Sequence, residues 1–170
     1  MKKYIFSTIF IFLVFSMSGC FTVSYSFTGA SIHPDIKTVS VQYIENRAAI
    51  VQPDLSQQIT DALKDRIESQ TSLKLVNGYG DVNFEGEITR YITQPKSVTA
   101  DEVASQTRFS ISVRLKYTNS IDPETDFDKS FERYEDFEST SNFEDEREKL
   151  TETIVDLLID DIFNQAFVNW

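Results

Sequence analysis

"RFSISVRLKYT" (residues 108–118) decides the fold, because its apolar and polar residues alternate without a break. A two-residue period is the pattern of a β-strand that buries one face. The apolar set is Phe109, Ile111, Val113, Leu115 and Tyr117, and the polar set is Arg108, Ser110, Ser112, Arg114 and Lys116. The stretch therefore predicts a central strand in a sheet with one apolar and one polar face.

Further stretches extend this sheet in both directions along the chain. Residues 36–44 and 82–92 alternate in the same way, residues 127–137 do so more weakly, and residues 73–76 form a short strand before a turn at 77–81. The residues expected to face inward are Val39, Val41, Tyr43, Val82, Phe84, Ile88, Ile92, Phe127, Phe131 and Phe137.

Two stretches have apolar residues at every fourth position, which is the spacing of one helix face. Residues 53–71 predict a helix that begins with Asp54 as the cap and Gln57 completing a capping box. Residues 142–170 predict a longer helix, whose acidic start suits the helix dipole. The two apolar stripes are Leu55, Ile59, Leu63 and Ile67, and Leu150, Ile154, Leu158, Ile162 and Ala166.

The order of these elements is strand, helix, three or four strands, helix. It predicts an α+β fold, a two-layer sandwich with two helices packed on one face of a mostly antiparallel (mixed) four-stranded sheet. The other face of the sheet is polar and mixed in charge sign. Two alternatives stay open for it: exposure to water, or docking in a hydrophilic partner.

The composition limits the function. The chain has 27 acidic against 16 basic residues, a net charge of −11, which disfavours binding to nucleic acid. The acidic residues concentrate at 122–148 without the spacing and glycine of an EF-hand, so no metal site is expected. The one histidine, His33, precedes a proline in a predicted exposed loop, and no nucleophile or phosphate-loop motif occurs. We therefore expect no cofactor and no enzymatic activity.

The single cysteine, Cys20, can form neither an internal disulfide nor a zinc site. Lys2 and Lys3 precede an apolar run of 14 residues (4–17), whereas a membrane-spanning helix needs about 20. This is the pattern of a signal peptide. "MSGC" (17–20) resembles a bacterial lipobox, which implies that Cys20 carries a diacylglycerol. An ordinary secreted protein with a free thiol is the alternative.

The expected organisation is then a signal peptide (1–19), a lipidated tether (20–34) and a single α+β domain (35–170). Residues 21–27 contain no acidic residue, and such a residue after the cysteine retains many lipoproteins at the inner membrane. Its absence favours the outer membrane.

Several stretches across this domain stand in the order expected of one family: "IKTVSVQYIENRA" (36–48), "EGEITRY" (85–91), "RFSISVRLKYTN" (108–119) and "IFNQAFVNW" (162–170). Together with the lipobox they resemble the LptE family of lipopolysaccharide-assembly lipoproteins. The resemblance implies a lipoprotein of the outer membrane that plugs the lumen of an LptD-type β-barrel, one to one, on its periplasmic side. Such a plug would support barrel assembly and lipopolysaccharide insertion. A lipid-binding or adaptor lipoprotein of another envelope transport system is the alternative.

The resemblance also raises a question about sugar-lipid contact, since the lipid A moiety is polyanionic. Lys96, Arg108, Arg114 and Lys116 are the candidate residues for contact with lipopolysaccharide or with the barrel. Pairing across the strands with Glu85 and Glu87 explains the same residues without a ligand. The long connection at 93–107 is a second candidate for contact with the barrel.

Overall fold

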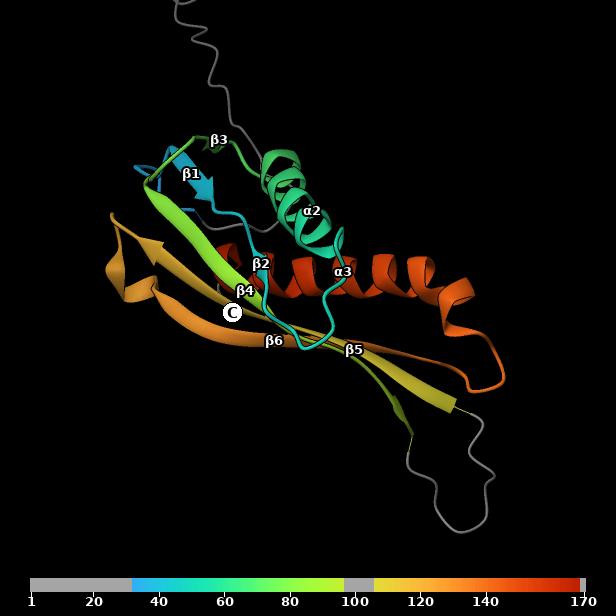
Figure 1. The fold of residues 1–170 in the computed structure, drawn as a ribbon. Helices are drawn as coiled ribbons and strands as arrows, with labels where there is room; N and C mark the ends of the chain where they lie inside the picture. The colour runs from blue at the N-terminus through green and yellow to red at the C-terminus, as the bar shows by residue number, and fades with distance from the viewer. Residues whose placement is uncertain (1–31, 97–105, 169–170) are drawn as a thin grey trace, which may run out of the picture.

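Two helices lie against one face of an open sheet in the computed structural model, which describes residues 32–96 and 106–168 (Figure 1). This arrangement confirms the predicted α+β sandwich. In chain order the elements are β1 (Thr38–Val41), β2 (Glu45–Asn46), α2 (Leu55–Gln70), β3 (Lys74–Leu75), β4 (Val82–Pro95), β5 (Gln106–Asn119), the 3₁₀ helix η1 (Pro123–Thr125), β6 (Phe127–Glu138) and α3 (Phe143–Phe167).

The strands follow the order β3-β1-β4-β5-β6, and β2 also pairs with β4. The long strands β4, β5 and β6 are antiparallel, whereas β1 runs parallel to β3 and β4, and β2 runs parallel to β4. The sheet is therefore mixed, and the predicted number of four strands was wrong, because the described residues form six.

β2 is one of the two additional strands, and it follows directly after the predicted strand at 36–44. The pairing of this part of the chain with β4 stops at Val41, the end of β1, and resumes at Glu45, the start of β2. Between these points the Ile44 amide donates to Thr60 Oγ1 of α2 (3.1 Å) instead of to a strand. Ile44 is buried and Tyr43 is exposed, so the expectation that Tyr43 faces inward was wrong.

β5 matches its predicted pattern throughout the alternating stretch. All five residues of its apolar set are buried, and they face the helices together with Val82, Phe84 and Ile88 of β4. Phe127, Phe131 and Phe137 of β6 are in phase with them, as predicted, and partly buried. The core thus lies between the middle strands and the two helices, and it supports the polar face of the sheet from behind.

A β-bulge in β4 changes which residues face the core. The register passes from Ile88 opposite Val113 to Arg90 opposite Ser112, which leaves Thr89 as the extra residue. An extra residue shifts the alternation by one. Tyr91 therefore points to the core, and Ile92, which was predicted to face inward, is only partly buried.

The helices confirm the predicted apolar stripes, because Leu55, Ile59, Leu63 and Ile67 of α2 and Ile154, Leu158 and Ile162 of α3 are fully buried. The capping box of α2 was wrong. Asp54 occupies the cap position without a side-chain hydrogen bond, and Gln57 instead donates to Asp61 (2.6 Å). Asn142 caps α3 by accepting from the Glu144 amide. None of the described helices is both long and apolar enough to cross a membrane.

Two adjacent carboxylates of α3 bind it to the elements on either side. Asp160 accepts from Arg66 of α2, and Asp161 accepts two hydrogen bonds from Arg133 of β6 (2.6 and 2.5 Å). These carboxylates point to different neighbours, as expected for consecutive residues of a helix. Asp160 thus links the two helices, and Asp161 links α3 to the sheet.

Candidate functional site

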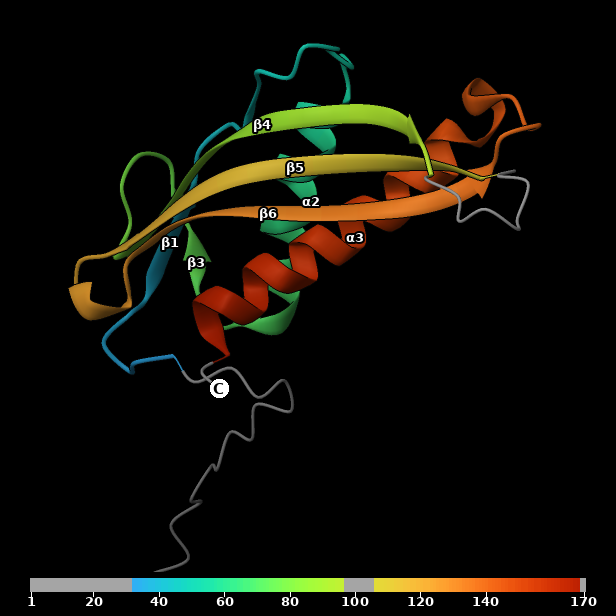
Figure 2. The same ribbon diagram turned by 90° about the horizontal axis from the view of Figure 1, so that it is seen from below.

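The candidate site is the polar face of the sheet, which we define as the outward side chains of β4, β5 and β6 together with Gln42, Tyr43, Glu45 and Arg47. This face lies opposite the helices (Figure 2). Charges of opposite sign alternate across it. Arg90 of β4, for example, reaches across β5 to Glu132 of β6 (3.0 Å), which also accepts from Ser112 (2.7 Å).

At one end of the polar face a single carboxylate, Asp136, holds two cations. Arg108 donates two hydrogen bonds to it (2.8 and 3.1 Å), and Lys96 Nζ lies 3.0 Å from its Oδ2. The Arg108 guanidinium also stacks 3.5 Å from the ring centroid of Tyr134. The hydrogen bond from Arg108 is the main cause that lowers the pKa of Asp136 to about 2.

We expect the pair of Asp136 and Arg108 to stabilise the fold in a pH-dependent way. Because the pKa of Asp136 is lower in the folded state than the ordinary value of 3.8, its contribution is present above about pH 4 and is lost as the pH falls toward 2. Asp136→Asn should lower the free energy of unfolding by roughly 1–3 kcal/mol at pH 7 and by much less near pH 2. Urea titrations at both pH values measure this difference.

Glu138→Gln on the same strand is the matched control, since Glu138 forms no ion pair among the described residues. A loss that is equal at both pH values for Asp136→Asn would contradict the assigned role.

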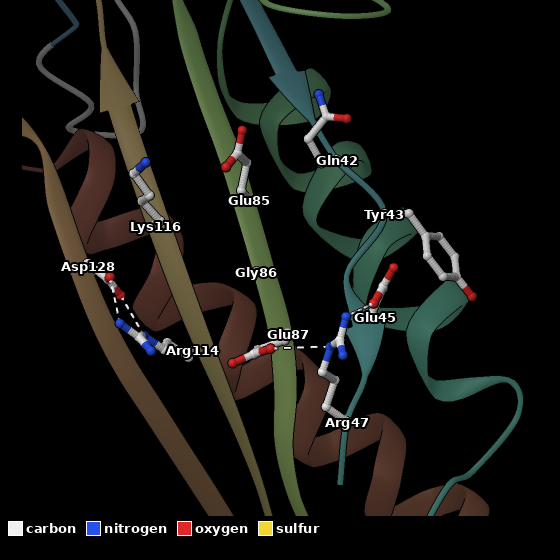
Figure 3. A pocket seen from close by; sticks show the side chains of 10 residues that line it. All are labelled: Gln42, Tyr43, Glu45, Arg47, Glu85, Gly86, Glu87, Arg114, Lys116 and Asp128. Atoms are coloured by element: carbon white, nitrogen blue, oxygen red, sulfur yellow. Dashed lines mark hydrogen bonds and ion pairs between the residues drawn. The ribbon is translucent and has the colours of Figure 1, made fainter.

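At the other end of the polar face lies a shallow groove of about 420 Å³ (Figure 3). Residues of β4, β5 and β6 form its floor, and the segment through β2 forms one wall. Its lining residues are Gln42, Tyr43, Glu45, Arg47, Glu85, Gly86, Glu87, Arg114, Lys116 and Asp128. The groove therefore carries both charge signs and one exposed aromatic ring.

The ion pairs in the groove differ from the predicted cross-strand pairs. Glu87 and Arg114 do lie directly opposite each other, as do Glu85 and Lys116. Arg114, however, donates two hydrogen bonds to Asp128 of β6 (both 2.9 Å), which raises its pKa. Glu87 lies 3.5 Å from Arg47 instead (Figure 3).

The four predicted contact residues thus share one face but do not form a single basic patch. Lys96 and Arg108 converge on Asp136, and Arg114 is paired with Asp128. Within the described part of the chain, Lys116 forms no ion pair, and the same is true of Glu85 opposite it. Lys116 is therefore the candidate without a salt bridge in the described part of the chain, with Glu85 and Asp128 directly opposite it on the neighbouring strands.

Sequence reasoning did not identify the groove wall formed by Tyr43, Glu45 and Arg47. Arg47 contacts both Glu45 (2.6 Å) and Glu87, so it connects β2 to the floor. The signal that was available is the charged "ENR" (45–47) directly after the strand pattern.

A second cavity, of about 320 Å³, lies where the described chain begins. Ile32, Ile36, Tyr117 and Phe167 contribute its apolar lining. Burial raises the pKa of Tyr117 to about 12, so its hydroxyl stays neutral at physiological pH. His33 is exposed, as predicted.

No three histidine, cysteine, aspartate or glutamate side chains within residues 32–96 and 106–168 gather closely enough to hold a metal ion. Cys20, Trp170 and residues 97–105 of the predicted loop lie outside the described residues.

Fold and site together define a class of small two-layer α+β domains in which helices cover one sheet face and paired charges cover the other. Solved structures share this fold. A hypothetical protein of Chlamydia trachomatis aligns with a TM-score of 0.55 and 11% identity over 79% of this chain and 99% of that chain. A minor lipoprotein of Acinetobacter baumannii aligns with a TM-score of 0.51 and 11% identity over 76% and 91%.

A lipoprotein of Nitrosomonas europaea has a TM-score of 0.50 and 13% identity over 75% and 79%. At these identities the likeness shows the fold alone.

The sequence model of one family, described as "LptE: Lipopolysaccharide-assembly", matches residues 36–166, so the chain belongs to this family. The resemblance found in the sequence is thereby confirmed. At the level of the family, the chain is a lipopolysaccharide-assembly protein. No curated protein sequence matches it significantly.

Proposed function

We propose that the protein is a non-catalytic lipoprotein plug and assembly factor of the outer-membrane lipopolysaccharide translocon. Cys20 anchors it through lipid, residues 1–19 are the signal peptide, residues 20–34 are the tether, and the domain from 35 to 170 sits inside an LptD-type barrel on the periplasmic side. Membership of the LptE family supports a role in lipopolysaccharide assembly.

The polar face of the sheet is the observation that carries the plug proposal. The lumen of a large membrane barrel is polar and hydrated. Where this face packs against the wall of the lumen its charges must stay compensated, because an unpaired charge that loses its water costs several kcal/mol. Arg90, Arg108 and Arg114 each have a carboxylate partner on another strand. These three cations therefore remain paired when the face leaves bulk water.

Contacts to the barrel or to lipopolysaccharide are part of the same proposal. We assign them to Lys96, Arg108, Arg114 and Lys116, of which Lys116 lines the groove without a salt bridge among the described residues. An anionic sugar lipid in the groove would meet this amine on β5.

Affinity capture tests the proposal. Full-length tagged protein, extracted from membranes in a mild detergent, is expected to bring down a large outer-membrane β-barrel protein in about equal molar amount, as quantitative mass spectrometry would measure. The same tag on an unrelated outer-membrane lipoprotein is the control. Recovery of an inner-membrane transporter in place of the barrel would support the adaptor function instead.

A further inference from the structure

β4 has an open edge beyond its short partner strands. On the side away from β5 it pairs with β1 as far as Phe84 and with β2 at Glu87 and Ile88. The last contact is the Arg47 amide, which donates to the Ile88 carbonyl (2.9 Å). From Arg90 to Pro95 no described strand pairs with this side of β4.

The backbone groups of this edge point away from the sheet. The Lys96 amide donates to the Gln106 carbonyl of β5 (3.0 Å). In an antiparallel pair successive residues alternate between bonding their partner and facing outward. Tyr91 and Thr93 therefore direct their backbone amides and carbonyls to the open side, and Thr93 is exposed.

An apolar loop tip lies beside this edge. The chain between β2 and α2 passes along β4 in both views (Figure 1, Figure 2). This loop leaves β4 after Arg47 and turns back toward β2, where the side-chain Nδ2 of Asn46 donates to the Gln52 carbonyl (3.4 Å). At its tip Ile50 is 57% exposed and Val51 is 63% exposed. The loop therefore presents two adjacent, largely exposed aliphatic side chains next to the point where the pairing of β2 with β4 ends.

The opposite edge of the sheet is protected against a further strand. β6 carries inward charges, since Lys129 and Arg133 reach under it to Gln165 and Asp161 of α3 (2.8 and 2.6 Å). Inward-pointing charges on an edge strand are a known device against edge-to-edge pairing. The open part of β4 has only one charged residue, Arg90, and Glu132 compensates it. Of the two long edge strands, β4 is therefore the one that can pair with a further strand.

We propose that this edge, Arg90–Gln94, takes up an extended strand of the barrel partner and that Ile50 and Val51 pack on the apolar side chains of that strand. The inference rests on the proposed function. Unpaired backbone amides and carbonyls are satisfied by another extended backbone, as in β-strand addition. A second copy of this chain is the weaker occupant, because two chains of net charge −11 repel each other. The partner strand is uncharged, with alternate apolar residues.

The test uses the full-length protein in membranes and two variants with exposed substitutions. Ile50→Glu combined with Val51→Glu should lower the recovered barrel by about tenfold or more. Ile121→Glu, at an exposed isoleucine (41%) in the turn between β5 and β6, is the matched control and should recover the wild-type amount. Thermal unfolding of all three proteins checks that the fold is intact.

A photo-crosslinking side chain placed at Thr93 provides a second measurement that does not depend on affinity. It should give a product containing the barrel, whereas the same probe at Glu135 of β6 should not. Unchanged barrel recovery by the Ile50 and Val51 variant, or crosslinks from Glu135 alone, would overturn the inference and leave the plug function standing. A product of two copies of this chain would overturn it as well. Failure of the wild-type protein to recover a barrel would overturn both this inference and the proposed plug function.

Discussion

Phe84→Ala is expected to lower the free energy of unfolding by about 3–5 kcal/mol. Phe84 is fully buried in the middle of the sheet, and its ring lies 5.0 Å from that of Tyr117 and 5.9 Å from that of Phe167. The substitution removes the ring, opens a cavity and breaks contacts that join β4, β5 and α3. Since small domains are stable by only about 5–15 kcal/mol, this single change removes a large part of the total.

Urea unfolding of the isolated domain, followed by circular dichroism, measures the loss. Tyr79→Ala is the control, because Tyr79 is an aromatic residue that is 79% exposed, and it should change stability by less than about 0.5 kcal/mol. A loss below about 1 kcal/mol for Phe84→Ala would show that this aromatic cluster does not hold the layers together.

Cys20→Ser is expected to abolish lipid attachment and to remove the protein from the outer-membrane fraction. Each buried methylene contributes about 0.8 kcal/mol to membrane binding, so the two or three acyl chains of a lipoprotein give an anchor that one chain does not. Labelled palmitate should enter the wild-type protein and not the variant. Membrane fractionation should show the change of location.

Ser24→Ala, which lies outside "MSGC" (17–20), is the control and should retain both the label and the location. A wild-type thiol that reacts with an alkylating reagent in denatured membranes would contradict lipidation at Cys20. It would leave the ordinary secreted protein as the better account of the N-terminus.

Much of the fold could be predicted from local patterns. The strand at 108–118 and both helical stripes are buried where the pattern placed them. The errors occur where a single residue breaks a repeat. The extra residue at Thr89 brings Tyr91 inward in place of Ile92, and the interruption at Ile44 separates β2 from the predicted strand at 36–44. Neither the threonine nor the isoleucine marks its position in the sequence as irregular. The bulge and the interruption both depend on contacts with a neighbouring strand or helix.

The candidate site was less predictable than the fold. Arg108, Arg114 and Lys116 were placed correctly on the polar face, but the salt bridges of Arg108 and Arg114 go to β6 and not to Glu85 or Glu87. The groove wall from Tyr43 to Arg47 depends on the path of the chain after β1. A periodic sequence pattern does not predict that path.

The sequence by itself determined which side of β5 and of the two helices is buried, because the periods of strand and helix depend only on neighbours along the chain. The tertiary structure decided which charges pair. A side chain on a central strand has a neighbouring strand about 4.8 Å away on each side, and long side chains also reach diagonal positions. Arg114 faces Glu87 on one side and bonds Asp128 on the other. Only the three-dimensional packing of β4, β5 and β6 distinguishes these two partners.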